Sequence, residues 1–207
     1  MRVPGGSWRV VVLVVLIGLA LGVLTVLGQG VLPGNWNRIA NSGAVWVAVA
    51  FAVGAFMASD RTAALAGATT LVGAVIGYYV TVPWLVEGAA SSSRSVAIWG
   101  VTALIGGPVF GLAGRWWRMG TDDRRAIAIA LLGGAFAAEG VYTLIHIAGP
   151  TGSQEAVGWT MLAIGVAIPL LLGRSPRGRA LGLVVMVPVG CLVFAAYSLI
   201  DLVFRSG

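Results

Sequence analysis

The sequence predicts an all-α polytopic integral membrane protein, a bundle of seven transmembrane helices that forms a single domain over residues 1–207. Three observations predict this fold class. Apolar residues make up 58% of the chain and charged residues only 10%, whereas a soluble domain is usually about a quarter charged. Seven apolar stretches of bilayer-spanning length cover most of the chain. Arginines gather in alternate loops between these stretches, as positive charge does in multi-pass membrane proteins.

Each predicted span is apolar over its length and is separated from the next by a short loop. The first span follows a basic segment, as a signal peptide would, but no small-x-small cleavage site comes after it, so we expect a retained helix. The second and sixth spans are short and are expected to borrow flanking residues. The seven spans run over Val10–Leu32, Gly43–Ala58, Ala63–Val86, Ser95–Gly114, Ala126–Ala148, Ala156–Gly173 and Ala180–Phe204.

All 13 basic residues are arginine, and the two sides of the membrane share them unequally. Ten lie on the side of the N-terminus, and three, Arg38, Arg94 and Arg205, lie on the other side. Because arginine-rich loops stay in the cytoplasm, this predicts a multi-pass protein of the bacterial inner membrane with its N-terminus in the cytoplasm and its C-terminus outside. Membrane orientation therefore accounts for the net charge of +6, and we expect the lipid bilayer, not nucleic acid, as a partner.

The even-numbered spans resemble one another. Trp46, Trp99 and Trp159 are each followed by an arginine 15 or 16 residues later. This spacing predicts one extra helix followed by three repeated helical hairpins. Equal helix lengths, with tryptophan at one interface and arginine at the other, would give the same spacing, so both interpretations stay open.

Small residues recur four apart in three spans, at Gly18 and Gly22, Gly73 and Gly77, and Gly107 and Gly111. This spacing lets helix backbones approach closely in lipid, and the same faces could hold an oligomer together. In the fourth span Pro108 lies among glycines, which predicts a kink or a break of the kind that lines transporter sites.

Polar side chains collect in the outer halves of the odd-numbered spans. Glu139, Tyr142 and His146 share one face of the fifth span. An ionisable residue inside a span is costly, which makes Glu139 the leading candidate for a functional site; we expect it to face the bundle interior with a partner from another odd-numbered span or from His146. The predicted binding residues are Glu139, Tyr142, His146, Asp201, Tyr78, Tyr197 and Gln29.

Each of these residues has a plainer alternative. Glu139 could be a satisfied carboxyl that only fixes packing, His146 an interfacial residue, and Asp201 a solvated helix end. One histidine without a paired spacing does not predict a metal site, and we expect no cofactor. No catalytic motif is found, so we expect no enzyme; Asp122 and Asp123 could hold an ion, but their loop is expected to rest against lipid headgroups.

Four stretches together look familiar: QGVLPGNWNRIANSGAVW (29–46), GYYVTVP (77–83), WGVTALIGGPVFGLAGRWWR (99–118) and LLGGAFAAEGVY (131–142). They resemble a family of small multi-spanning actinobacterial membrane proteins catalogued only as a domain of unknown function. The resemblance implies class and localisation, and no activity. The polar loop at 35–43 either dips back toward an outer cavity or forms an ordinary interfacial turn.

These features favour a small transporter-like or ligand-binding protein with an outward-facing polar cavity, whose ligand would be a small molecule or ion of unknown identity. In this interpretation Glu139 is a proton or cation site. The alternative is a non-transporting accessory or structural membrane protein, in which the polar residues only stabilise the bundle.

Overall fold

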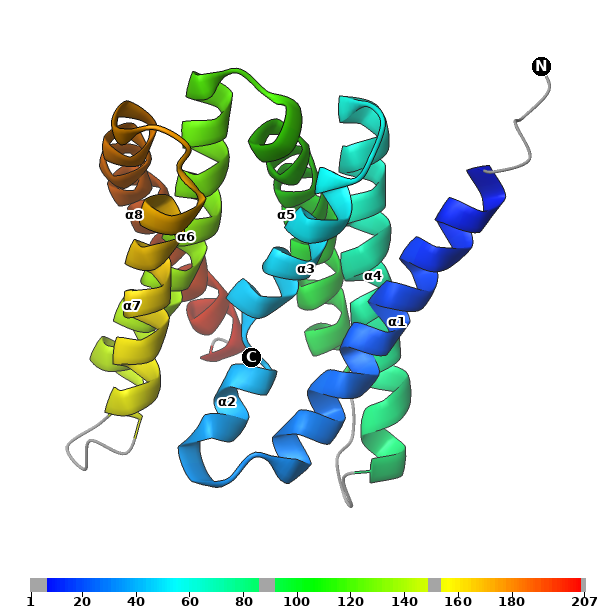
Figure 1. The fold of residues 1–207 in the computed structure, drawn as a ribbon. Coiled ribbons are helices and arrows are strands. Elements are labelled where there is room, and N and C mark those ends of the chain that lie inside the picture. The colour runs from blue at the N-terminus through cyan, green and yellow to red at the C-terminus, as the bar shows by residue number, and fades with distance from the viewer. Residues whose placement is uncertain (1–6, 86–91, 149–153, 206–207) are drawn as a thin grey trace.

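The computed structural model describes residues 7–85, 92–148 and 154–205. The described residues form helices and no strand, and seven helices are long and apolar enough to cross a membrane, which confirms the predicted fold class (Figure 1). The elements are α1 (Ser7–Val31), η1 (Gly34–Trp36), α2 (Asn37–Ala40), α3 (Gly43–Ala55), α4 (Asp60–Leu85), α5 (Ser93–Met119), α6 (Asp122–His146), α7 (Glu155–Leu172) and α8 (Pro176–Arg205).

The predicted spans correspond to these helices to within a few residues, except in the second span. There α3 ends at Ala55, three residues before the predicted end, and the crossing segment begins at Gly34 and includes η1 and α2. The second span is therefore interrupted between Ala40 and Gly43, and it borrows its outer part from the polar loop. The predicted end of the third span, Val86, lies outside the described residues.

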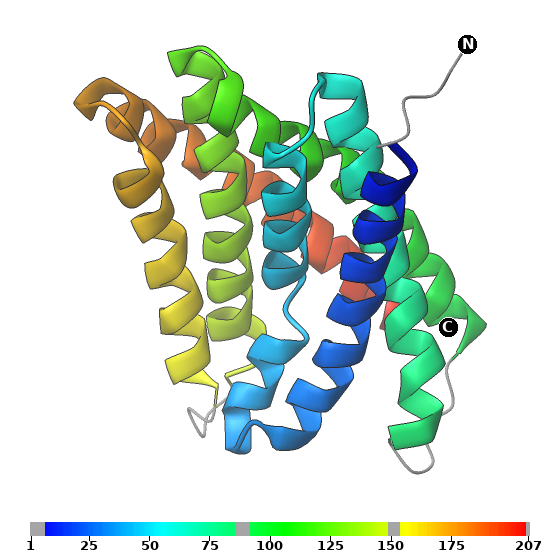
Figure 2. The same cartoon turned by 45° about the vertical axis from the view of Figure 1, so that its right-hand side comes forward.

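The helices pack in two groups that meet at α6. In the first group α4 lies against α1 and α5, and α3 lies against α4 and α5; in the second group α6 packs against both α7 and α8. Helices α7 and α8 contact each other far less than each contacts α6. Figure 2 shows α8 crossing obliquely behind the other helices. Because α6 lies between the two groups, most of its residues are buried.

Glycine pairs bring α1 and α4 together. A Cβ added at Gly22 would lie 2.2 Å from the carbonyl oxygen of Ala74, and one at Gly77 would lie 2.4 Å from that of Leu19. Gly18 and Gly73 face each other in the same way. The predicted role of this spacing in close helix packing is confirmed, and these glycines are covered within the chain, not exposed for a second copy.

Helix α5 is held by the same kind of contact. Gly107 and Gly111 lie against the backbone of α4, and Gly114 lies against Phe51 of α3. Helix α5 continues through Pro108 without a break. A break at Pro108 is therefore not found, and the interrupted span is the second one, for which no break was predicted.

The three tryptophans of the proposed repeat lie in different surroundings. Trp46 is half-buried and donates a hydrogen bond from Nε1 to Thr25 Oγ1 at 3.0 Å, whereas Trp159 is 60% exposed. The third hairpin also differs from the others, because α7 and α8 have little mutual contact. These differences in exposure and contact do not test whether the three hairpins superpose, so the repeat stays a prediction from spacing.

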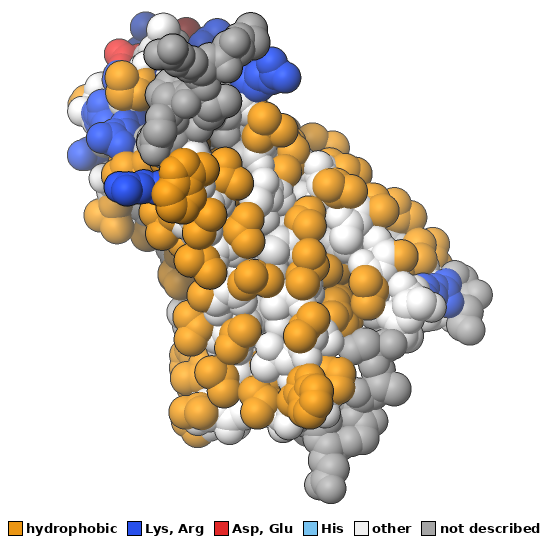
Figure 3. All heavy atoms as spheres, turned by 90° about the vertical axis from the view of Figure 1, so that its right-hand side faces the viewer, with side chains coloured by type: hydrophobic (Ala, Val, Ile, Leu, Met, Phe, Trp, Pro, Cys, Tyr) orange, Lys and Arg blue, Asp and Glu red, His pale blue; other side chains and the backbone are white. Residues whose placement is uncertain are grey.

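The outer surface has the pattern of a protein that lies in lipid. Figure 3 shows apolar side chains over most of one side of the molecule, with arginines gathered mainly at one end. Large apolar side chains such as Leu104, Val184 and Leu192 are more than half exposed. Since soluble proteins rarely expose continuous apolar surface, this arrangement agrees with a multi-pass membrane protein.

Candidate functional site

Glu139 lies inside the bundle, as predicted, and its side chain connects three helices. The residue is 4% exposed. Its Oε2 atom accepts hydrogen bonds from Ser42 Oγ at 2.9 Å, from the backbone N–H of Ala44 at 2.8 Å and from the Tyr197 hydroxyl at 2.9 Å. The carboxyl group of α6 is thereby joined to the start of α3 and to α8.

The interruption of the second span explains why Glu139 finds a backbone donor. The first N–H groups of a helix have no partner inside that helix, and they carry a partial positive charge. Ser42 caps α3 by accepting a hydrogen bond from the N–H of Val45 at 3.2 Å, and Glu139 takes the N–H of Ala44. An acidic side chain from another helix therefore completes the N-terminal cap of α3.

Gly43 makes room for this arrangement. A Cβ at this position would lie 2.6 Å from the hydroxyl of Tyr197 and 3.9 Å from Oε2 of Glu139. The absence of a side chain at residue 43 thus lets the tyrosine approach the start of α3.

Aromatic rings extend outward from Glu139. Tyr142 is stacked on Tyr197 with ring centroids 5.5 Å apart, and it contacts the ring of His146 at 4.7 Å. Phe194 closes the cluster at 5.8 Å from Tyr142. Tyr142 is buried, whereas His146 is exposed at the end of α6. The face of α6 predicted from the sequence therefore runs from a buried carboxyl to an exposed imidazole.

A cavity of about 450 Å³ lies over this face. Several of its lining residues, including Asn37, Asn41 and His146, are exposed, so the cavity opens at the surface. Its lining comes from the ends of helices that lie away from the arginine-rich loops. The polar and aromatic lining residues are Gln29, Asn37, Arg38, Asn41, Trp99, Glu139, Tyr142, His146, Gln154, Tyr197, Asp201, Phe204 and Arg205.

Six of the seven predicted site residues line this cavity, and Tyr78 does not. Tyr78 packs instead against Trp46, with centroids 6.1 Å apart, and against Tyr79 at 5.2 Å, and these three residues line a smaller neighbouring pocket. The other odd-numbered spans offer Tyr78, Tyr197 and Gln29 as partners for Glu139. Tyr78 packs against Trp46, which itself bonds Thr25, and no hydrogen bond joins Tyr78 to Glu139. Of the expected partners of Glu139, Tyr197 is the one found.

Asp201 lies at the edge of the cavity and pairs with a residue of its own helix. Its Oδ2 atom is 2.7 Å from Nη2 of Arg205, and both side chains are partly exposed. The charge of Asp201 is thus balanced locally by Arg205.

Sequence reasoning missed Ser42, the backbone of Ala44 and Arg38. The signal for Ser42 was present, since serine before a glycine–alanine helix start is a typical N-cap. The polar loop at 35–43 does dip back toward the cavity, because Asn37, Arg38 and Asn41 line it. The position of the loop relative to the membrane interface stays a prediction.

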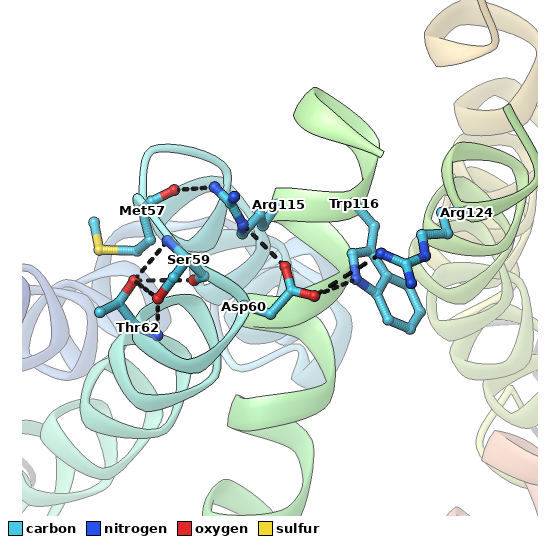
Figure 4. A network of polar contacts seen from close by, with 7 residues as sticks. All are labelled: Met57, Ser59, Asp60, Thr62, Arg115, Trp116 and Arg124. Carbon is cyan, nitrogen blue, oxygen red and sulfur yellow. Dashed lines mark hydrogen bonds and ion pairs between the residues drawn. The ribbon is translucent and has the colours of Figure 1, made fainter. Parts of the chain in front are cut away.

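At the opposite end of the molecule, side chains of α5 and α6 contact an acidic residue at the start of α4 (Figure 4). Asp60 accepts hydrogen bonds from Arg115 Nε at 2.9 Å and from Trp116 Nε1 at 3.3 Å, and Arg124 approaches it to 4.0 Å. Arg115 and Trp116 were expected to rest on lipid headgroups. Both side chains also contact Asp60, at the start of α4, and their contact with headgroups stays a prediction.

Asp122, at the same end of the molecule, forms an ion pair. Asp122 lies 3.0 Å from Arg125 on the same helix. Over residues 7–85, 92–148 and 154–205, no group of three or more histidine, cysteine or acidic side chains is arranged to hold a metal ion.

The chain belongs to a family of unknown function, DUF6518, whose sequence profile matches residues 1–203. This confirms the resemblance to a family known only as a domain of unknown function. No curated protein and no solved structure shows significant similarity to the chain.

Proposed function

We propose that this protein is a transporter-like or ligand-binding membrane protein, with an outward-facing polar cavity in which Glu139 is the charged site. The observation that carries the proposal is that a cavity of about 450 Å³ reaches a buried carboxyl group inside a bundle of membrane-spanning helices. Ligand pockets for small molecules commonly have volumes of roughly 300–1,000 Å³. An ionisable side chain inside a membrane-spanning helix costs free energy, so it commonly marks a functional site.

The interrupted second span supports the same function. In transporters, discontinuous helices present unpaired backbone groups at a binding site inside the membrane. Here α2 lines the cavity through Asn37 and Arg38, and the start of α3 is tied to Glu139. The ten-to-three distribution of arginines supports an orientation in the bacterial inner membrane in which this cavity faces outside and the N-terminus is cytoplasmic.

One observation favours the alternative, a non-transporting accessory or structural protein. Oε2 of Glu139 already accepts three hydrogen bonds. A carboxylate with three donors stabilises the fold without any ligand. The open cavity over the same residue distinguishes the two functions, because a purely structural carboxyl needs no access from the surface.

The experiment measures the thermal unfolding temperature of the purified protein in lipid nanodiscs with propylamine, butyrate, glycine, β-alanine or γ-aminobutyrate. At least one of the ammonium-bearing probes should raise the unfolding temperature of the wild type and have no effect on Glu139→Gln. The variant should fold, since its amide oxygen can accept the same hydrogen bonds. Glu155→Gln, an exposed change in α7, is the matched control. If no ammonium-bearing probe, glycine and β-alanine included, stabilises the wild type, the proposed function is wrong.

A further inference from the structure

Four side chains with full charges line the cavity: Arg38, Glu139, Asp201 and Arg205. Asp201 and Arg205 are 2.7 Å apart and balance each other. The charges that remain for a ligand are therefore one cation, on α2, and one anion, on α6.

Arg38 has no protein partner within the described residues. Its guanidinium makes no hydrogen bond or ion pair with any residue of 7–85, 92–148 or 154–205, and its Nε atom is buried without an acceptor. The side chain is half-buried and lines the cavity. A partly desolvated guanidinium is stabilised by a planar acceptor such as a carboxylate, which can bind two of its N–H groups at once.

Glu139 also keeps one atom available. The three donors from Ser42, Ala44 and Tyr197 all reach Oε2, and no described residue donates to Oε1. Oε1 is not among the buried atoms that lack a partner, so it is accessible from the cavity. A carboxylate oxygen of this kind accepts a hydrogen bond from an ammonium group.

We propose that the cavity binds a small zwitterion, with its ammonium group at Oε1 of Glu139 and its carboxylate on the guanidinium of Arg38. This inference rests on the proposed function and specifies its ligand class. A simple cation would leave Arg38 without an acceptor, and a simple anion would leave Oε1 without a donor. A zwitterion satisfies both and adds no net charge to a site inside the membrane.

The rest of the cavity suits the carbon skeleton of such a ligand. Trp99, Tyr142 and Phe204 supply apolar surface to the lining. Aromatic side chains with a few placed polar groups are typical of small-molecule sites. The volume of about 450 Å³ leaves space for an amino acid with several carbons between its charges.

The test measures the affinity of wild-type protein in nanodiscs for glycine, β-alanine and γ-aminobutyrate, which differ in the distance between their charges. Propylamine and butyrate are the matched half-molecules, each with one charge. The best zwitterion should bind about tenfold or more tightly than either half-molecule. In Arg38→Gln this advantage over propylamine should disappear, and Arg38→Lys should keep part of it, because lysine retains the charge but not the planar fork. Arg61→Gln, an exposed arginine outside the cavity, should bind as the wild type does.

Two outcomes would overturn the inference. If propylamine binds as tightly as every zwitterion, the site takes a simple cation. If Arg38→Gln binds the zwitterion as the wild type does, Arg38 does not hold the ligand carboxylate. In either case the inference is wrong while the proposed function stands. If no zwitterion and no half-molecule binds the wild type, both are wrong. Because Arg38 makes no side-chain hydrogen bond or ion pair among the described residues, its replacement removes no such bond of the fold, and an unchanged unfolding temperature in the absence of ligand verifies this.

Discussion

The charged side chains at the two ends of the molecule differ in how many polar partners they have within the described residues. At the arginine-rich end, Asp60 is surrounded by donors, and Arg115 also donates to the carbonyl oxygen of Met57 at 2.7 Å. At the other end, Arg38 and one oxygen of Glu139 have no partner among the described residues and line a cavity. One end is closed by its own polar contacts, and the other keeps unsatisfied groups where a ligand could reach them.

The difference between the ends also concerns how much their polar contacts contribute to stability. The ion pairs around Asp60 lie at exposed surface, where each contributes little to stability. The contacts of Glu139 are buried, so each of them matters more to the fold. We therefore expect the residue that serves the cavity to be also the polar residue on which the fold depends most.

The largest effect is expected for Glu139→Ala. Removal of the carboxyl leaves two buried donors, from Ser42 and Ala44, and the part-buried hydroxyl of Tyr197 without an acceptor. The free energy of unfolding should fall by about 3–5 kcal/mol, since each unsatisfied buried donor costs about 1–3 kcal/mol and some will find water in the cavity. Chemical unfolding in detergent measures this, with the exposed Glu155→Ala as control; equal losses in the two variants would contradict the central position of Glu139.

A pair of glycine substitutions compares the two ends directly. In Gly114→Ala the new Cβ would lie 1.8 Å from a backbone oxygen of Phe51, which cannot move away, so stability should fall by about 1–3 kcal/mol. In Gly43→Ala the Cβ meets the tip of Tyr197 at 2.6 Å, and a side chain can shift. Gly43→Ala should therefore lose less stability than Gly114→Ala. It should also lose the hydrogen bond between Tyr197 and Glu139.

The same unfolding measurement, with Gly100→Ala as the control, tests this pair. A Cβ at Gly100 meets nothing within 4 Å, so this variant should be as stable as the wild type. A loss in Gly43→Ala as large as in Gly114→Ala would mean that the cavity end is packed as rigidly as the arginine-rich end.

A smaller effect is expected for Tyr197→Phe. The ring can keep its stacking on Tyr142, at 5.5 Å, while the hydrogen bond to Glu139 is lost. Stability should fall by about 1 kcal/mol, the net contribution of one hydrogen bond. Tyr78→Phe is the control, since the Tyr78 hydroxyl bonds no described residue. Two variants of equal stability would show that the Tyr197 hydroxyl adds nothing at Oε2.

The smallest effect is expected for Asp60→Asn. This residue is half-exposed, and exposed ion pairs contribute about 0–1 kcal/mol. The loss should shrink as salt is raised from low concentration to about 1 M, because salt screens exposed charges. A loss as large as that of Glu139→Ala, or one independent of salt, would remove the contrast between the two ends.

The sequence predicted the helices well, because hydropathy and the arginine distribution depend on the bilayer and not on the tertiary contacts. The glycine pairs were also predictable in their role, although only the structure shows that Gly18 and Gly22 face Gly73 and Gly77. Helix periodicity gives the face of a helix, and so it placed Glu139 and Tyr142 correctly on one side of α6.

Helix periodicity does not predict which other helix packs against that face. Two helices with polar outer halves need not pack against each other. For this reason Tyr197 donates a hydrogen bond to Glu139, whereas Tyr78 packs against Trp46. The backbone N–H of Ala44 carries no sequence signal at all, since every residue has such a group and only a break in the span exposes it. Arg38 was counted for topology, and its place in the cavity depends on the fold of the loop that carries it.

The central claim is that the end with unsatisfied charges opens to the outside and the closed end lies in the cytoplasm. The most direct measurement labels single cysteines in intact cells with a membrane-impermeant thiol reagent, after the one native cysteine has been removed by Cys191→Ser. Asn41→Cys, which lines the cavity, should react in intact cells, and Ser59→Cys, beside the Asp60 network, should react only after the membrane is permeabilised. Reaction of Ser59→Cys in intact cells, with Asn41→Cys protected, would contradict the account.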